Sequence, residues 1–224
     1  FAVSSWCKET DTIYHPLDAP KLEILLINTM QENSLNFMLA SSERVKGLKV
    51  MAMINSFYRP PLLLPQSTRC LTNLRTLRLR GWDLGDLSFI VSLRRLEILD
   101  LSNCYFKDLP KGMDKLNKLK LLDLSHYEIP GNLNYEAIGS CLQLEELYAF
   151  GYTQKCHRQH IEDIVTLPNL QRFVIRLGQF EALDNEESVR VLHLLDFSMS
   201  NIGASKQNLL QRAEVVCLTN FLGE

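Results

Sequence analysis

Three stretches of the chain repeat one spacing of leucines, and this spacing decides the fold. They read LTNLRTLRLRGW (Leu71 to Trp82), LRRLEILDLSNC (Leu93 to Cys104) and LNKLKLLDLSHY (Leu116 to Tyr127). Each stretch follows L-x-x-L-x-x-L-x-L, and a polar residue separates its last two leucines. This alternation places the two leucines on one face of a strand and the polar residue on the other. One such unit cannot bury its leucines alone, so the pattern predicts that successive units stack around a shared core.

The spacing is that of the leucine-rich repeat, and it extends in both directions. We take the first residue of each Leu-x-Leu pair as the anchor of a repeat. Anchors recur every 19 to 26 residues, mostly within the ~20–29 residues of this repeat class. The interval of 19 ends at Leu192; a frame starting at Leu195 gives 22, and both frames stay open. The anchors are Phe1, Leu25, Met51, Leu77, Leu99, Leu122, Leu147, Phe173, Leu192 and Val216.

The predicted fold class is α/β, a leucine-rich repeat solenoid shaped as a curved horseshoe. Parallel strands form the concave face, and irregular loops or short helices form the convex face. Residues 1–224 are interpreted as one domain of about nine to ten irregular repeats. Repeat arrays need terminal caps with a polar outer face, and neither end shows one. We therefore expect the chain to be a segment of a longer receptor.

The outer turns have weaker signals. Ser41–Arg44 predicts a serine-capped turn of helix, and Ile161–Val165 has helical spacing before a proline. Two prolines make Tyr58–Leu64 a loop or extended backbone. We expect Gly131–Ile138 and Gln179–Ser188 to be irregular.

The asparagine ladder that often joins successive outer turns is nearly absent from the sequence. The ladder residue should be the fifth after each anchor, and only Cys104 fits there. We therefore expect uneven curvature and some mobile outer loops. We interpret Trp6 and Trp82 as packing residues on the outer turns. The residues at the ladder position are Met30, Ser56, Trp82, Cys104, Tyr127 and Tyr152.

Composition restricts the classes of partner and the compartment. The 24 Lys and Arg against 26 Asp and Glu give a net charge of −2, which provides no electrostatic footprint for nucleic acid or anionic lipid. No apolar run approaches the ~20 residues that span a bilayer. The six cysteines form no C-x-x-C or paired disulfide cap, and no N-x-S/T sequon occurs. These absences favour a reducing compartment, so we expect cytoplasmic localisation.

Beyond the generic repeat, the chain resembles the leucine-rich repeat region of plant coiled-coil nucleotide-binding resistance proteins. The resemblance covers roughly Asp18 to Phe150. It is carried by Ala19-Pro20-Lys21-Leu22, by Gly47 to Met51, by the stretch from Leu71 that ends in Leu109-Pro110, and by CLQLEELY from Cys141 to Tyr148.

The resemblance implies an autoinhibitory and effector-sensing module of an intracellular plant immune receptor. Its implied partners are a pathogen effector or a guarded host protein, together with a nucleotide-binding domain outside this chain. The phosphate-binding G-x-x-x-x-G-K-[ST] loop of that domain has no counterpart in these residues, so we expect no cofactor.

The predicted concave face offers the candidate binding site. Stacked strands align the residues between the core positions into columns, one running through Leu26, Ala52, Arg78, Asp100, Asp123, Tyr148, Val174, His193 and Cys217. We expect Arg78 to reach Asp100, and the carboxylates of Asp100 and Asp123 to lie side by side. The plainer alternative is a solvated sheet face. Tyr, Phe and Arg dominate interface hot spots, and the candidate partner-binding residues are Arg78, Arg80, Asp100, Asp123, Glu146, Tyr148, Phe150, Arg172 and Arg176.

The sequence gives no support for catalysis or a metal site. Cys156, His157 and His160 have no second ligand pair at a fitting distance for zinc. Ser125 and His126 are neighbours along a predicted strand and would point to opposite faces. We predict that the chain is not an enzyme.

Two alternative functions stay open. One is a generic repeat adaptor, such as the substrate-recognition subunit of a ubiquitin ligase, which would need a recruitment motif. The other is an extracellular receptor ectodomain, against which the absent sequons, cap cysteines and L-x-G-x-I-P turns count.

Overall fold

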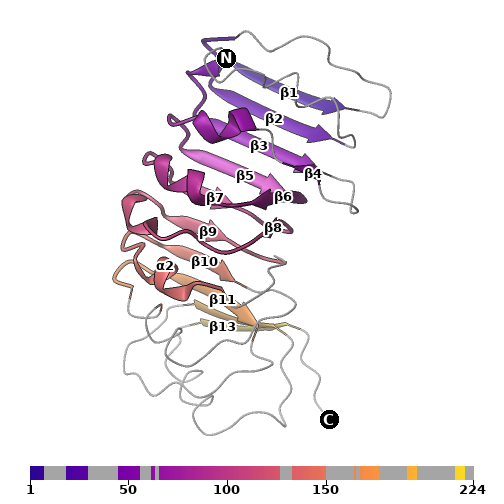
Figure 1. Cartoon of the computed structure of the whole chain (residues 1–224). Helices are drawn as coiled ribbons and strands as arrows, with labels where there is room; N and C mark the ends of the chain where they lie inside the picture. Colours follow the sequence, from indigo (N-terminus) through magenta and orange to yellow (C-terminus); the bar gives the residue numbers. More distant parts are fainter. Residues whose placement is uncertain are drawn as a thin grey trace, which may run out of the picture.

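The computed structural model shows a leucine-rich repeat solenoid in which each repeat contributes one strand to a single parallel sheet (Figure 1). It describes residues 1–7, 19–29, 45–55, 62–63, 66–126, 133–149, 164, 167–176, 191–195 and 215–219. The ten strands follow chain order, and each pairs in parallel with the next. They are β1 (Ala2–Cys7), β2 (Ile24–Thr29), β3 (Val50–Asn55), β5 (Thr76–Arg80), β7 (Ile98–Asp100), β9 (Leu121–Asp123), β10 (Glu146–Ala149), β11 (Arg172–Arg176), β12 (Val191–Leu195) and β13 (Val215–Thr219).

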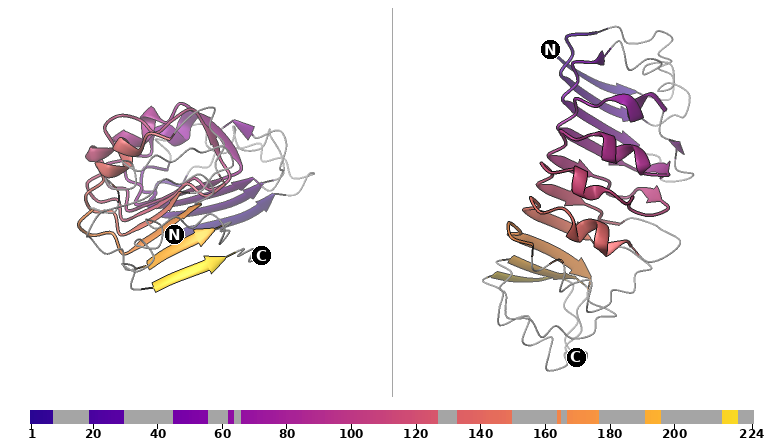
Figure 2. Two further views of the ribbon diagram at one scale, coloured as in Figure 1. Left: turned by 90° about the horizontal axis from the view of Figure 1, so that it is seen from below. Right: turned by 60° about the vertical axis from the view of Figure 1, so that its left-hand side comes forward.

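Short helices and a second, smaller sheet form the outer side. Figure 2 shows the helices stacked along one side of the solenoid and the main sheet along the other. The smaller sheet is parallel and contains β4 (Leu62–Leu63), β6 (Trp82–Gly85) and β8 (Tyr105–Phe106). The outer helices are the 3₁₀ turns η2 (Gln66–Cys70), η3 (Ser88–Ser92) and η4 (Met113–Lys115), and the α-helix α2 (Tyr135–Gly139).

The strand register confirms the predicted repeat frame over most of the chain. Leu77 pairs with Leu99, and Leu99 with Leu122, so successive anchors lie side by side. Phe173 pairs with Leu192, which selects the Leu192 frame over the Leu195 frame.

The first anchor was predicted wrongly. Val3, not Phe1, pairs with Leu25, and Phe1 is 83% exposed. The apolar pair of the first repeat is weak in the sequence, and a frame set by Phe1 is therefore two residues out of register.

A turn at the start of each repeat positions the strand that follows. In L-x-x-L, the backbone N–H of the fourth residue donates to the carbonyl of the first, at 2.9 Å for Leu96 to Leu93 and for Leu119 to Leu116. The same bond forms from Leu144 to Cys141, which occupies a leucine position. All these leucines are buried and belong to one hydrophobic core cluster. The turn therefore directs two side chains into the core, six and three residues before the anchor.

Two side chains perform the ladder role that asparagine has in regular repeats. The Trp82 indole N–H donates to the Met53 carbonyl at 2.9 Å, and the Cys104 thiol donates to the Leu79 carbonyl at 3.2 Å. Both acceptors follow an anchor by two residues in the preceding repeat. Burial raises the pKa of the Cys104 thiol to about 12, so the thiol keeps the proton that it donates. The sequence predicted Cys104, but it missed Trp82 because an indole N–H can replace an amide donor.

Several other outer-side predictions need correction. Trp6 lies in β1 of the main sheet, where it pairs with Asn28, and not on an outer turn. Part of the stretch expected to be irregular, Gly131–Ile138, forms α2, because the Asn134 side chain caps it by accepting the Ala137 N–H at 3.1 Å. Within the stretch Tyr58–Leu64, which was predicted to be loop or extended backbone from its two prolines, the described residues Leu62–Leu63 form an extended strand. The predictions for Ser41–Arg44 and Gln179–Ser188 lie outside the described residues.

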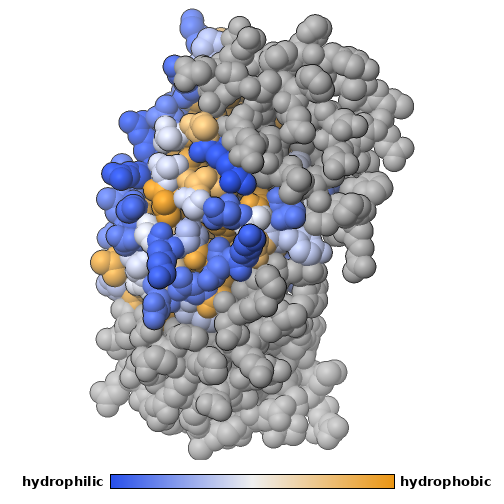
Figure 3. Space-filling model, viewed as in Figure 1, coloured by the Kyte–Doolittle hydropathy of each residue, from blue (hydrophilic) through white to orange (hydrophobic). Residues whose placement is uncertain are grey.

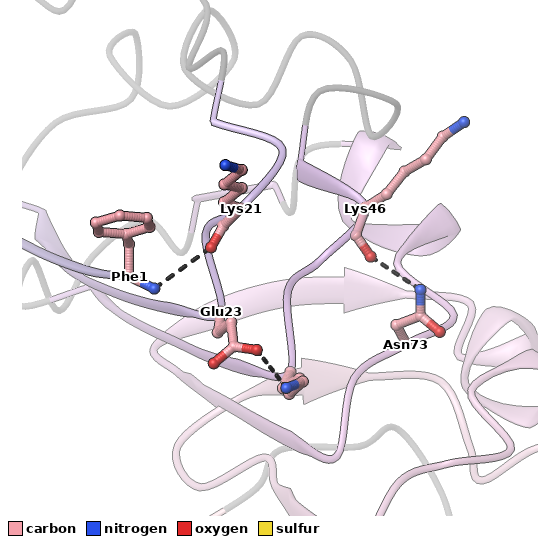
Figure 4. Close-up of polar contacts among 6 residues, drawn as sticks. Phe1, Lys21, Glu23, Lys46 and Asn73 are labelled. Carbon is pink, nitrogen blue, oxygen red and sulfur yellow. Dashed lines mark hydrogen bonds and ion pairs between the residues drawn. The ribbon is translucent and has the colours of Figure 1, made fainter.

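One border of the main sheet carries a row of residues, each two positions before an anchor, and all of them except Gln171 are charged. Backbone bonds of 2.7–2.9 Å join the row from one repeat to the next. Side-chain pairs add to it: Glu23 with Lys49 (Figure 4), Arg75 with Glu97 at 3.4 Å, and Lys120 with Glu145 at 2.7 Å. Exposed ion pairs contribute little stability, but opposite charges at equal register favour correct stacking. This edge row consists of Glu23, Lys49, Arg75, Glu97, Lys120, Glu145 and Gln171.

The turn glycines give a matched test of the stacking distance. Gly81 has φ +76°, and a Cβ there would lie 2.6 Å from the Asn55 carbonyl oxygen of the neighbouring repeat. Gly85 has φ +56° but open space around its Cβ position. We predict that Gly81→Ala lowers the free energy of unfolding by about 2–4 kcal/mol and Gly85→Ala by only about 1 kcal/mol. Equal losses in urea unfolding would contradict the close approach of the two turns.

The indole ladder bond can be tested by Trp82→Phe. This change leaves the Met53 carbonyl without its donor and reduces a fully buried side chain, so we expect a loss of about 2–3 kcal/mol in thermal or urea unfolding. Phe106→Leu reduces a buried aromatic side chain on the next strand of the smaller sheet but removes no side-chain donor. If the two variants lose the same stability, the indole N–H contributes nothing.

Candidate functional site: the concave face

The concave face consists of the side chains that project from the main sheet away from the leucine core. The predicted column is confirmed: Arg78 pairs with Asp100, Asp100 with Asp123, and Asp123 with Tyr148. Val174 pairs with Tyr148 in turn, but it is buried and offers little surface. The sheet therefore places four of the candidate residues on four adjacent strands.

The spacing also predicts a second column, two residues after the first, and this column is shorter than expected. Its predicted members are Asn28, Ile54, Arg80, Ser102, Ser125, Phe150 and Arg176. Arg80 ends β5 and is exposed, but β7 and β9 have only three residues each. Ser102 and Ser125 consequently lie in turns, and Ser125 is buried. His126 follows Ser125 in a left-handed conformation with φ +56°, so these two residues do not alternate along a strand as predicted.

The aspartates of the first column are part of the turns that end their strands. Asp100 Oδ1 accepts the Ser102 N–H at 3.0 Å, and Asp123 Oδ1 accepts the Ser125 N–H at 2.8 Å. The expected ion pair between Arg78 and Asp100 does not form within the described part of the chain. Each aspartate thus has a structural role, because one of its carboxylate oxygens accepts a hydrogen bond within its own turn.

Asp123 has an environment that disfavours its charge. Burial raises the pKa of the Asp123 carboxyl, and the neighbouring Asp100 carboxylate raises it further, against the hydrogen bonds from Ser125 that lower it. The adjacency of two like charges was predicted from the sequence. A cationic group of a partner would relieve it.

Three candidate residues on β10 and β11 form one hydrogen-bonded cluster. The Tyr148 hydroxyl donates to Glu146 Oε2 at 2.7 Å and accepts from Arg172 Nη1 at 3.1 Å. Arg172 Nη1 also lies 3.7 Å from Glu146 Oε2. Burial raises the pKa of the Tyr148 phenol, so the hydroxyl remains a donor at neutral pH. The cluster presents a fixed aromatic ring with a charged group on each side.

The remaining candidates are only partly visible. Phe150 lies outside the described residues, and Arg176 is placed in β11 by its backbone alone. The Cys156–His160 segment also lies outside them. No group of three or more His, Cys, Asp or Glu that would suit a metal ion occurs in the described ranges.

The sequence prediction missed an apolar area on the concave side of β2 and β3. Ile24, Leu26 and Ile54 are 37%, 41% and 38% exposed, which is unusual for large apolar side chains in a folded sheet. Val50 and Ala52 lie beside them and are partly exposed. The sequence placed Leu26 and Ala52 in the concave column, but none of these apolar residues was named as a candidate binding residue.

Figure 3 shows one face of the molecule, on the side that carries the short helices. In the view of Figure 3, the coloured residues are mainly hydrophilic, with smaller hydrophobic areas between them. Within the described residues, no helix has the length and apolar character to cross a membrane.

Asp123→Asn tests the electrostatic environment of the column. Asparagine keeps the oxygen that accepts the Ser125 N–H but removes the charge. A raised folded-state pKa contributes stability that is present below the unfolded pKa, near 3.8, and is lost as pH rises through the folded pKa. We therefore expect Asp123→Asn to be more stable than the parent at pH 7, and the difference to vanish below pH 4. Asp123→Ala also removes the acceptor of the Ser125 N–H, which should lower the free energy of unfolding by about 0.5–1.5 kcal/mol. If Asp123→Asn is less stable at pH 7, this assignment is wrong.

Comparison with known proteins supports the fold. No protein-family profile and no curated protein sequence matches the chain. Among solved structures, a leucine-rich repeat protein of Leptospira interrogans is similar with a TM-score of 0.51 and 21% identity over 90% of this chain and 44% of that one.

Two plant receptors are also similar. One is the ectodomain of the receptor kinase GASSHO1/SCHENGEN3 from Arabidopsis thaliana, in complex with CASPARIAN STRIP INTEGRITY FACTOR 2. Its TM-score is 0.53 and its sequence identity is 19%, and the match covers 91% of this chain and 28% of that one. The other is the plant peptide hormone receptor RGFR1, in complex with RGF2. Its TM-score is 0.50 and its sequence identity is 16%, and the match covers 91% of this chain and 29% of that one. The chain spans less than half the length of each of these three proteins, and the likeness shows a leucine-rich repeat solenoid.

Proposed function

We propose that this chain is the protein-recognition and effector-sensing module of an intracellular plant immune receptor. The observation that carries the proposal is the continuous column Arg78–Asp100–Asp123–Tyr148 on an open parallel sheet, with its exposed or partly exposed side chains facing away from the core. An open sheet face that presents arginine and tyrosine side chains suits recognition of another protein. The chain is therefore proposed to be a binding module and not an enzyme.

The proposed cytoplasmic location has two kinds of support. The described cysteines Cys70, Cys104 and Cys141 are all free, and burial raises the pKa of Cys104 and Cys141 to about 12. Free thiols in the repeat core are compatible with a reducing compartment. The sequence also lacks N-x-S/T sequons.

The resemblance to plant resistance proteins supplies the proposed biological role. Its signature residues occupy structural positions here: Leu109 is buried after β8, and Cys141 replaces the first leucine of its repeat. The fold is also that of two plant receptors described in complex with a named ligand. The proposed partners are a pathogen effector or a guarded host protein, and the nucleotide-binding domain of the same receptor in the resting state.

A full-length receptor that contains this segment tests the proposal. We expect Tyr148→Ala with Arg172→Glu to weaken effector or guarded-protein binding at least ~10-fold, or to release autoinhibition, since the change breaks the Glu146–Tyr148–Arg172 cluster. The measurements are co-purified binding and cell death in leaf tissue. Arg94→Glu, on an exposed turn, is the control, because it makes the same change of net charge away from the concave face.

Unchanged binding together with unchanged receptor silence would contradict the site. The coding sequence that flanks the segment tests the class of receptor: a phosphate-binding loop upstream agrees with the proposal, whereas a secretory signal or a ubiquitin-ligase recruitment motif contradicts it.

A further inference from the structure

The N-terminal part of the concave face combines apolar and cationic side chains that the molecule itself leaves exposed. Ile24 and Leu26 project from β2, and Ile54 projects from β3, each more than a third exposed. In solution, large apolar side chains grouped on one face mark an interaction site more often than isolated ones do.

The register places two arginines directly beside this apolar group. Leu26 pairs with Ala52 and Ala52 with Arg78, while Ile54 pairs with Arg80. Adjacent strands lie ~4.8 Å apart, so Leu26 and Arg78, which are in register across three strands, lie about 10 Å apart, and Ile54 and Arg80 lie on adjacent strands. A single extended segment of a partner, or about two turns of a helix, covers this distance.

The guanidinium groups of Arg78 and Arg80 contribute no polar contact to the described part of the fold. Both residues are exposed, and within the described part of the chain neither has an ion-pair or hydrogen-bond partner. Asp100, the nearest candidate in register, uses its carboxylate in its own turn. A guanidinium presents a planar set of donors that matches a carboxylate in bidentate geometry. The missing partner of this arginine pair is therefore an anion, held next to an apolar surface.

We propose that β2, β3 and β5 form a docking patch for an acidic–apolar segment of a partner protein. Its apolar side chains cover Leu26 and Ile54, and its carboxylates pair with Arg78 and Arg80. The inference rests on the proposed function, because it specifies the partner chemistry of the same concave face. The patch is defined by Ile24, Leu26, Val50, Ala52, Ile54, Arg78 and Arg80.

Other occupants fit the charges less well. A nucleic acid or anionic membrane extending past the arginines meets Asp100 and Asp123 on the next two strands, and the chain as a whole has a net charge of −2. A second copy in a two-fold contact presents the same patch to itself. That contact brings four guanidinium groups together without any carboxylate from the patch.

The test is selection of a random 12-residue peptide library, displayed on phage, against the full 224-residue chain. We expect enriched peptides to combine leucine, isoleucine or phenylalanine with aspartate or glutamate. A synthetic peptide from the selection should bind Arg78→Gln/Arg80→Gln at least ~10-fold more weakly than the parent, since loss of both charge-assisted contacts removes its anion site. Leu26→Asn/Ile54→Asn should weaken it as well.

Arg94→Gln/Arg95→Gln is the matched control, since it removes the same charge from an exposed turn and should bind as the parent does. Circular dichroism and thermal unfolding should be unchanged in both arginine variants, because neither Arg78 nor Arg80 supports the fold. Several outcomes overturn the proposal: no enriched peptide, enrichment of basic or uncharged peptides, or equal weakening by the control. Sedimentation showing a dimer that Leu26→Asn/Ile54→Asn dissociates also overturns it, in favour of a second copy.

Failure of this proposal can be distinguished from failure of the proposed function. If the receptor's effector or guarded protein still depends on Tyr148 and Arg172 while the selected peptides do not depend on Arg78 and Arg80, only the docking patch is wrong.

Discussion

The leucine side chains of consecutive repeats fill one shared interior, and the other features depend on this stacking. Because no repeat can bury its leucines alone, the strands must lie in register, with Leu77, Leu99 and Leu122 side by side. This register fixes the position of every residue between the anchors. The concave columns are thus a geometric consequence of the core.

Two polar systems maintain the register where leucines cannot. On the outer side, Trp82 and Cys104 each donate to a carbonyl of the preceding repeat. At the sheet border, the edge row joins successive repeats through backbone bonds and through pairs of opposite charge. These contacts are directional, whereas leucine packing is not, and so they define which residues face each other.

The sequence predicted the fold and most of the register because the leucine spacing is periodic and its physical cause is simple. It placed Arg78, Asp100, Asp123 and Tyr148 in one column, as the structure does. It failed at Trp82, where an indole N–H takes the place of the asparagine amide that usually donates the ladder hydrogen bond. It also failed at the first repeat, where the apolar pair is weak and Val3 is the anchor.

The candidate site was less predictable than the fold. Side-chain contacts depend on rotamers and on strand length, so the turn bonds of Asp100 and Asp123 and the cluster around Tyr148 cannot be obtained from spacing. The apolar area around Leu26 was missed as a binding surface for another reason. The spacing placed Leu26 on the concave side, but it does not give the exposed fraction of that side chain.

The most direct measurement of the stacking is a spin-label distance between Glu23→Cys and Gln171→Cys, at the two ends of the edge row. The other reactive cysteines are replaced by serine. Six steps of ~4.8 Å predict a main distance of about 25–30 Å. A narrow distribution in that range supports the solenoid. A main distance below about 20 Å would mean that the chain closes into a globule, and would contradict both the leucine core and the concave face built on it.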